Sequence, residues 1–154
     1  MIKINVITNN ISWQKYIKKP DNFIEKNLKN INKKNRDYKK KNIFCTLLLS
    51  GNKEIKKLNK KFRKKDKTTD VLSFPFYNKK ELKNKLKREK EIYLGDIIVN
   101  LNKIKDKHNL ASFKKEFNIL WIHGLVHLFG YDHKKVRDFV TMQKIEKIFL
   151  SYLN

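Results

Sequence analysis

Three histidines between residues 123 and 133, in the segment HGLVHLFGYDH, follow the pattern H-x3-H-x5-H with a glycine between the second and the third. His123 and His127 are four residues apart, so on a helix their side chains project from one face and can bind one metal ion together. Gly130 stands where helices commonly end in a left-handed residue, which lets the chain turn back and bring His133 to the same ion. Three imidazoles leave a fourth tetrahedral position open for water, as in catalytic zinc sites.

A buried histidine is more often a hydrogen-bonded core residue than a metal ligand, so the surroundings of the motif decide between the two. Residues 117–129, which read FNILWIHGLVHLF, are apolar almost all round, and the predicted helix should therefore be buried. Two buried imidazoles one turn apart would be costly unless something binds them. We therefore predict a metal site. Because three imidazoles without a carboxylate favour zinc over other transition metals, we expect one Zn²⁺ ion per chain.

The net charge of the chain points to a polyanionic partner. The 154 residues include 38 Lys and Arg against 15 Asp and Glu, a formal net charge of +23. Such a field attracts polyanions and makes nucleic acid the expected macromolecular partner. The alternative is a compositional bias, because lysine and asparagine are abundant along the whole chain whereas glycine and proline are scarce. The sign of the charge is therefore a better guide to the partner than its size.

The expected compartment is the cytoplasm. The single cysteine, Cys45, has no second cysteine in the chain to pair with, and it lies in the apolar run IFCTLLL, as a core residue in a reducing compartment would. The N-terminal residues lack the order of a signal peptide, and the longest apolar run is too short to span a membrane. We therefore expect no membrane partner.

Hydrophobic periodicity predicts the elements that must position the histidines. Strands are expected at residues 1–7, 43–49, 71–76 and 92–99. Helices are expected at residues 11–33, with Pro20 marking a start inside that segment, at 52–64, from the N-cap Ser112 onward, and from Lys134 onward. The continuous apolar run of the second strand predicts burial on both faces, and Pro75 predicts that the third strand lies at a sheet edge.

The resulting order βαβαββαα predicts a single α+β domain over residues 1–154, with about four strands in one sheet packed against helices and the histidines on a buried helix. Residues 77–91 are mostly charged, which favours a solvated helix or a mobile loop over an RNA-contacting arm. In the last helix, an apolar stripe is expected to pack in the core: Val136, Phe139, Met142, Ile145, Phe149 and Tyr152.

The histidine spacing is shared with the metzincin metalloproteases, whose motif places a glutamate directly after the first histidine as general base. This chain has Gly124 at that position, so a zinc metalloprotease is the less favoured function. A metal ion also lowers the pKa of bound water toward 7 and can act as a Lewis acid on a phosphoryl oxygen. With a basic surface, this chemistry favours phosphodiester hydrolysis. We interpret Gly124 as leaving room for a phosphodiester beside the metal.

Three motifs together resemble the YbeY family of bacterial metal-dependent endoribonucleases. The motifs are the histidine segment, the stretch NKKFRKKDKTTDVLSFPF at residues 59–76, and LGDIIVN at residues 94–100. They occur in the family's order, and the size and predicted elements agree over nearly the whole chain. The sequence departs from the family at Thr68, where proline is usual, and at Val126, where leucine is usual.

The resemblance implies roles for single residues. His123, His127 and His133 match the three zinc ligands of the family, and Arg63, in FRKKD, matches its essential arginine. A guanidinium suits that role because it binds phosphate bidentately and stabilises the charge that develops on it. Without the resemblance, Arg63 is indistinguishable from the solvated basic residues around it.

Other residues of the matching motifs are candidates for shaping the site. Ser73 lies on a strand that the family places beside the metal cleft, and the preceding Thr69 and Asp70 suit turn or cap roles equally well. Asp96 is a candidate to orient a ligand imidazole by hydrogen bonding. No residue is an evident general base. The fourth histidine, His108, lies outside the motifs and is expected at the surface.

The resemblance therefore implies a zinc-dependent endoribonuclease that cleaves single-stranded RNA, matures the 3′ end of 16S ribosomal RNA and serves ribosome quality control. The expected partners are single-stranded RNA and ribosomal RNA or a ribosomal subunit. Two alternatives stay open: a zinc metalloprotease, and a non-catalytic RNA-binding factor of ribosome assembly that holds a structural zinc.

Overall fold

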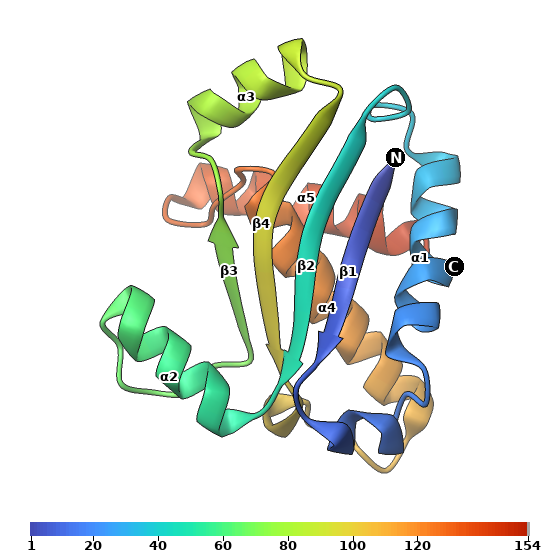
Figure 1. The fold of residues 1–154 in the computed structure, drawn as a ribbon, viewed down its shortest axis with the longest axis vertical. Coiled ribbons are helices and arrows are strands. Elements are labelled where there is room, and N and C mark those ends of the chain that lie inside the picture. The colour runs from blue at the N-terminus through green and yellow to red at the C-terminus, as the bar shows by residue number, and fades with distance from the viewer. Residues whose placement is uncertain (154) are drawn as a thin grey trace.

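A four-stranded sheet organises the protein, whose computed structural model describes residues 1–153; the last residue of the expected domain lies outside the described residues. The strands are β1 (Ile2–Thr8), β2 (Asn42–Ser50), β3 (Val71–Pro75) and β4 (Glu91–Asn100). Their order in the sheet is β1-β2-β4-β3, with β1, β2 and β4 parallel and β3 antiparallel to β4 (Figure 1). The predicted α+β class is confirmed, and β3 lies at an edge as Pro75 requires.

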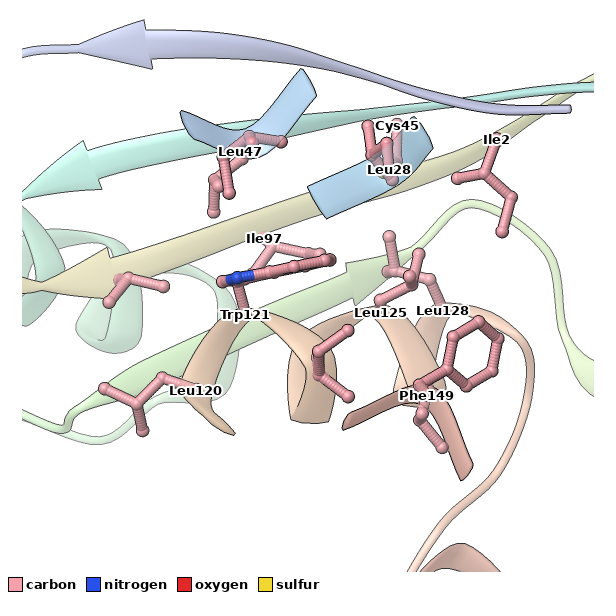
Figure 2. Close-up of a cluster of buried hydrophobic side chains, with 14 of the residues drawn as sticks. Ile2, Leu28, Cys45, Leu47, Ile97, Leu120, Trp121, Leu125, Leu128 and Phe149 are labelled. Carbon is pink, nitrogen blue, oxygen red and sulfur yellow. The ribbon is translucent and has the colours of Figure 1, made fainter. Parts of the chain in front are cut away.

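One face of the sheet, the inner face, is covered by helices and forms the main core. The helices are α1 (Pro20–Lys34), α4 (Leu110–Leu128) and α5 (Val136–Ser151), of which α4 and α5 pass behind the sheet in Figure 1. Trp121 and Leu125 of α4 belong to the same buried cluster as Ile97 of β4 (Figure 2). Within residues 1–153, no helix combines the length and apolarity needed to cross a bilayer.

The opposite face, the outer face, is covered at one end only. Here α2 (Asn52–Arg63) packs Ile55 against Leu72 and Ile98 in a small second cluster. The predicted burial of the second strand on both faces is therefore only half right: Ile43, Cys45, Leu47 and Leu49 are buried on the inner face, whereas Phe44, Thr46 and Leu48 on the outer face are half-buried.

The connections differ from the expected elements in detail. The helix expected at residues 11–33 is two elements, a short 3-10 helix, η1 (Ile11–Lys15), and α1, which begins at Pro20 as the sequence indicates. A second 3-10 turn, η2 (Leu101–Lys103), follows β4. The charged segment after β3 contains α3 (Lys79–Arg88), whose N-terminus is closed by a capping box between Asn78 and Glu81 and which buries Leu82.

One expectation for the C-terminal helices is wrong, and another is only partly right. The N-cap of α4 is Asn109, whose side chain accepts from the backbone N–H groups of Ala111 and Ser112, so the helix begins before Ser112. In α5, Met142 and Phe149 are buried, but Val136 is 83% exposed and Phe139 is 46% exposed. The first turns of α5 therefore lie outside the core, and burial begins at Met142.

Gly124 permits the close approach of α4 to the sheet. A Cβ atom added there would lie 2.5 Å from Cγ2 of Ile97 on β4 and 3.3 Å from Oγ of Ser73 on β3. The residue is buried and faces the sheet. The interpretation that Gly124 makes room for a phosphodiester is therefore wrong. The space that the missing side chain leaves is filled by Ile97, and a larger residue would push the histidine-bearing helix off the sheet.

We predict that Gly124→Ala destabilises the protein. At an unhindered helical position this change stabilises by up to about 1 kcal/mol, but the clash with Ile97 should cost about 1–3 kcal/mol in overpacking. Chemical denaturation of the two proteins measures the difference in the free energy of unfolding. Higher stability of the alanine variant would contradict the close packing.

Candidate metal centre

The structure brings the three motif histidines together at the C-terminal end of α4. His123 and His127 lie on α4, and His133 lies on the loop that follows it. One potential ligand nitrogen from each of the three rings lies within 4.8 Å of the others. Zinc ligands at about 2.1 Å in a tetrahedron are about 3.4 Å apart, so a modest contraction suffices for all three to bind one ion.

Gly130 brings His133 back toward the helix. Its φ of 84° lies in the left-handed region that glycine adopts readily, as predicted from its position after the helix. Its backbone N–H donates to the carbonyl of His127 at 2.9 Å, and that of Tyr131 donates to the carbonyl of Val126 at 3.3 Å. These bonds end α4 and fix the start of the loop.

The other nitrogen of each helical imidazole is held by a hydrogen bond. Nδ1 of His123 lies 2.6 Å from Oε1 of Glu146 on α5, and Nδ1 of His127 lies 2.9 Å from the carbonyl oxygen of Tyr131. Both partners are acceptors, so Nδ1 carries the proton in each ring. Such contacts orient ligand imidazoles and raise their basicity. Neither contact can be predicted from the sequence. Glu146 is 23 residues from His123, in an amphipathic helix where no spacing marks it, and the partner of His127 is a backbone carbonyl, which every residue has.

The remaining nitrogens require a cation between them. Nε2 of His123 and Nε2 of His127 are 3.1 Å apart. Burial, with the neighbouring His123 as the next contribution, lowers the pKa of His127 to about 4, so its imidazole is neutral at pH 7 and presents a lone pair at Nε2. Two lone pairs this close repel each other unless a proton or a metal ion lies between them. The third imidazole favours a metal ion, and imidazole nitrogens are ligands that suit zinc.

A cleft of about 1030 Å³ surrounds the histidines. Arg63, the last residue of α2, and Ser73 of β3 line it together with the three histidines, so segments far apart in the sequence meet there. Thr69 and Asp70 also line the cleft. Asp70 additionally accepts hydrogen bonds from the Thr69 hydroxyl and from the backbone of the next residue, which is the turn role that the sequence allows.

Asp96 lies elsewhere, contrary to the expectation that it orients a ligand imidazole. It is exposed on the outer face of the sheet, where Oδ1 accepts from the Tyr93 hydroxyl at 2.6 Å. The β-bulge of β4 near Gly95 sets which face each following side chain occupies, and sequence alone does not reveal it. The carboxylate that contacts an imidazole is that of Glu146. His108 is exposed, as expected.

Known proteins resemble the chain along nearly its whole length. A family model described as "Endoribonuclease YbeY" matches residues 6–154. An Endoribonuclease YbeY of Pelagibacter ubique (strain HTCC1062) is 42% identical over 155 residues, with 99% of this chain and 97% of that protein covered. One of Ehrlichia canis (strain Jake) is 34% identical over 148 residues, with 95% and 88% covered.

The fold is also similar to a solved structure. A Thermotoga maritima protein whose structure was determined in solution superimposes with a TM-score of 0.59 at 26% sequence identity, and the match covers 98% of this chain and 89% of that one.

We predict that His127→Ala removes stoichiometric metal, because only two imidazoles then remain. Elemental analysis of the purified protein should fall from about one zinc per chain to a small fraction. His108→Ala, which removes an exposed histidine outside the cluster, is the matched control and should leave the metal content unchanged. Full metal content in His127→Ala would contradict the assignment.

A second prediction concerns Glu146. Glu146→Ala should weaken zinc affinity about 10- to 100-fold, because His123 loses the acceptor that orients it. Glu146→Gln keeps an acceptor oxygen and should lose less. Competition with a coloured chelator measures the affinity, and Glu25→Ala, which removes an exposed carboxylate on α1, is the control. Unchanged affinity in Glu146→Ala would show that the contact does not support the metal site.

Proposed function

Because the chain belongs to the YbeY family of endoribonucleases, we propose that it is a zinc-dependent endoribonuclease that cleaves single-stranded RNA, with residues 1–154 acting as one domain. The observation that supports this most directly is the shared cleft of Arg63 and the three histidines. A cleft that offers a metal site and a guanidinium has the two positive groups that phosphodiester hydrolysis needs.

In this proposal His123, His127 and His133 hold the metal. When bound, zinc supplies a Lewis acid and a water of lowered pKa. Glu146 and the carbonyl of Tyr131 fix the orientation of two of the imidazoles and keep their Nε2 atoms turned to the cleft. Arg63 binds a phosphate of the RNA with its planar fork and stabilises the negative charge that grows on it during cleavage.

The protease alternative is weakened by packing as well as by sequence. The metzincin general base would have to arise from position 124, whose Cβ direction points into Ile97 of the sheet rather than into the cleft. The structural-zinc alternative is weakened by the number of ligands. The ligand group found among residues 1–153 supplies three imidazoles, whereas structural zinc sites are closed by four protein ligands.

The biological role we propose is maturation of the 3′ end of 16S ribosomal RNA and ribosome quality control in the cytoplasm, with ribosomal RNA or a ribosomal subunit as partner. Support comes from the family and from the net charge of +23, which suits a polyanionic substrate.

Digestion of single-stranded RNA with and without a chelator tests the proposed activity. Cleavage should stop when the chelator removes the metal and return when zinc is added back. A casein digest run in parallel tests the protease alternative. Binding of RNA without metal-dependent cleavage would favour the non-catalytic assembly factor.

Arg63→Ala is predicted to keep the fold and the zinc content while lowering the RNA cleavage rate by about 100- to 1000-fold, the usual loss for one preorganised donor. Arg63→Lys should recover only part of the rate, because an ammonium lacks the bidentate fork. Arg36→Ala, which removes an exposed arginine that does not line the cleft, is the matched control. Wild-type turnover by Arg63→Ala would eliminate this role.

RNA affinity should fall steeply with salt, because a basic surface binds largely by releasing counterions. For single strands the slope of log K against log salt is about −0.7 per neutralised phosphate, so about five contacts predict a slope near −3.5. Fluorescence anisotropy at several salt concentrations measures it. A flat response would mean that the charge does not hold RNA.

A further inference from the structure

The outer face of the sheet carries a row of aromatic side chains on the part that α2 does not cover. Strand pairing aligns Lys3 of β1 with Phe44 of β2, and Phe44 with Tyr93 of β4. Phe76, directly after β3, completes the row, since its ring centroid is 5.9 Å from that of Tyr93. Phe76 is 66% exposed, Tyr93 is 36% exposed and Phe44 is half-buried. Three rings, two on adjacent strands and one just after the edge strand, are therefore partly or largely open to solvent on one face.

The row is held in place rather than loosely exposed. The Tyr93 hydroxyl donates to Oδ1 of Asp96 at 2.6 Å and lies 2.9 Å from the Thr46 hydroxyl, which ties the ring along the sheet. The ammonium of Lys3 lies 5.5 Å from the centroid of the Phe44 ring, in cation–π range. These contacts fix the rings at little further entropic cost to a ligand that stacks on them.

The aromatic row is continuous with the metal cleft. Phe76 belongs to both, because it lines the cleft and also contacts Tyr93 edge-on, at 74° between ring planes. The strand that separates the two surfaces, β3, is only five residues long and lies at the sheet edge. A flexible chain can therefore leave the cleft past Phe76 and continue over Tyr93 to Phe44.

The charges around the row favour a polyanion. In Figure 1, α2 and α3 lie at opposite ends of the β3 side of the sheet, whose uncovered face is turned to the viewer. Six of the twelve residues of α2 and six of the ten residues of α3 are Lys or Arg, against one Glu in each. Two acidic residues lie beside Tyr93 on this strand: the carboxylate of Asp96 accepts from the Tyr93 hydroxyl, and that of Glu91 accepts from the side-chain amide of Asn42.

We propose that this aromatic row is a platform on which the bases of single-stranded RNA stack while the backbone continues into the metal cleft. Aromatic rings that accept any base, flanked by cations, are the usual means of binding single strands without sequence preference. A paired duplex could not use the platform, because its bases are already stacked on each other. The inference rests on the proposed ribonuclease function and adds how the substrate is held.

Anisotropy titrations of the zinc-loaded protein with a cleavage-resistant 2′-O-methyl strand of about 12 nucleotides, within the range of known single-strand sites, test the platform. Tyr93→Ala and Phe44→Ala should each weaken binding about 10-fold or more, because each removes the aromatic partner of one stacked base. Tyr93→Phe keeps the ring but loses the hydroxyl bond to Asp96, so it should recover most, though not all, of the affinity that Tyr93→Ala loses. Ile7→Ala is the matched control, because it removes an exposed apolar side chain without a ring from the same face.

Wild-type affinity in both alanine variants would overturn the platform, whereas a wild-type protein that neither binds nor cleaves RNA would overturn the proposed function itself. Cleavage of a substrate of two or three nucleotides distinguishes loss of the platform from loss of the ribonuclease activity. Such a substrate fits within the cleft, so the alanine variants should cleave it at the wild-type rate. Photo-crosslinking of wild type to 5-iodouridine RNA gives a readout free of any folding defect. Adducts are expected at Phe44 or Tyr93, and adducts confined to the cleft would contradict the inference.

Discussion

The mutual position of two imidazoles on one helix is the constraint on which the site depends. Nε2 of His123 and Nε2 of His127 face each other at 3.1 Å while both Nδ1 atoms are committed to acceptors. In this geometry a proton or a metal ion must lie between the two Nε2 atoms. The rest of the structure either holds these two rings in place or brings a third to them.

Two features of the fold hold the imidazoles in this position: the close packing of α4 against the sheet and the sharp turn that follows α4. Gly124 lets α4 approach the sheet until Ile97 fills the space of the missing side chain, which fixes the height of both rings above β3 and β4. Gly130 ends the helix and returns the chain toward it with His133. From the far side, α5 supplies Glu146 to the same cluster, so its first turns lie beside the cleft instead of in the core.

The local features of the site could be predicted from the sequence, and the tertiary ones could not. The spacing of His123, His127 and Gly130 reports helix geometry directly, which is why the grouping of the histidines was predictable. The partner of His123 depends on how α5 crosses α4, and no local pattern encodes that crossing. The sequence does not reveal that Asp96 lies on the outer face of the sheet, because a bulge in β4 changes the face on which the following side chains emerge. The apolar stripe of α5 predicts one apolar helix face, but it does not predict how many side chains of that face are buried in the core.

X-ray absorption at the zinc edge of the loaded protein shows directly whether the three histidines bind the metal. Three nitrogen ligands of imidazole type at about 2.0–2.1 Å and a further light atom are expected, with no sulfur. Sulfur in the coordination sphere would contradict a site made of the three histidines. The single cysteine, Cys45, lies in the main core, and burial raises the pKa of its thiol to about 12, so it is not expected to bind the metal. A sphere of oxygen ligands without imidazole scattering would equally contradict a site built on His123, His127 and His133.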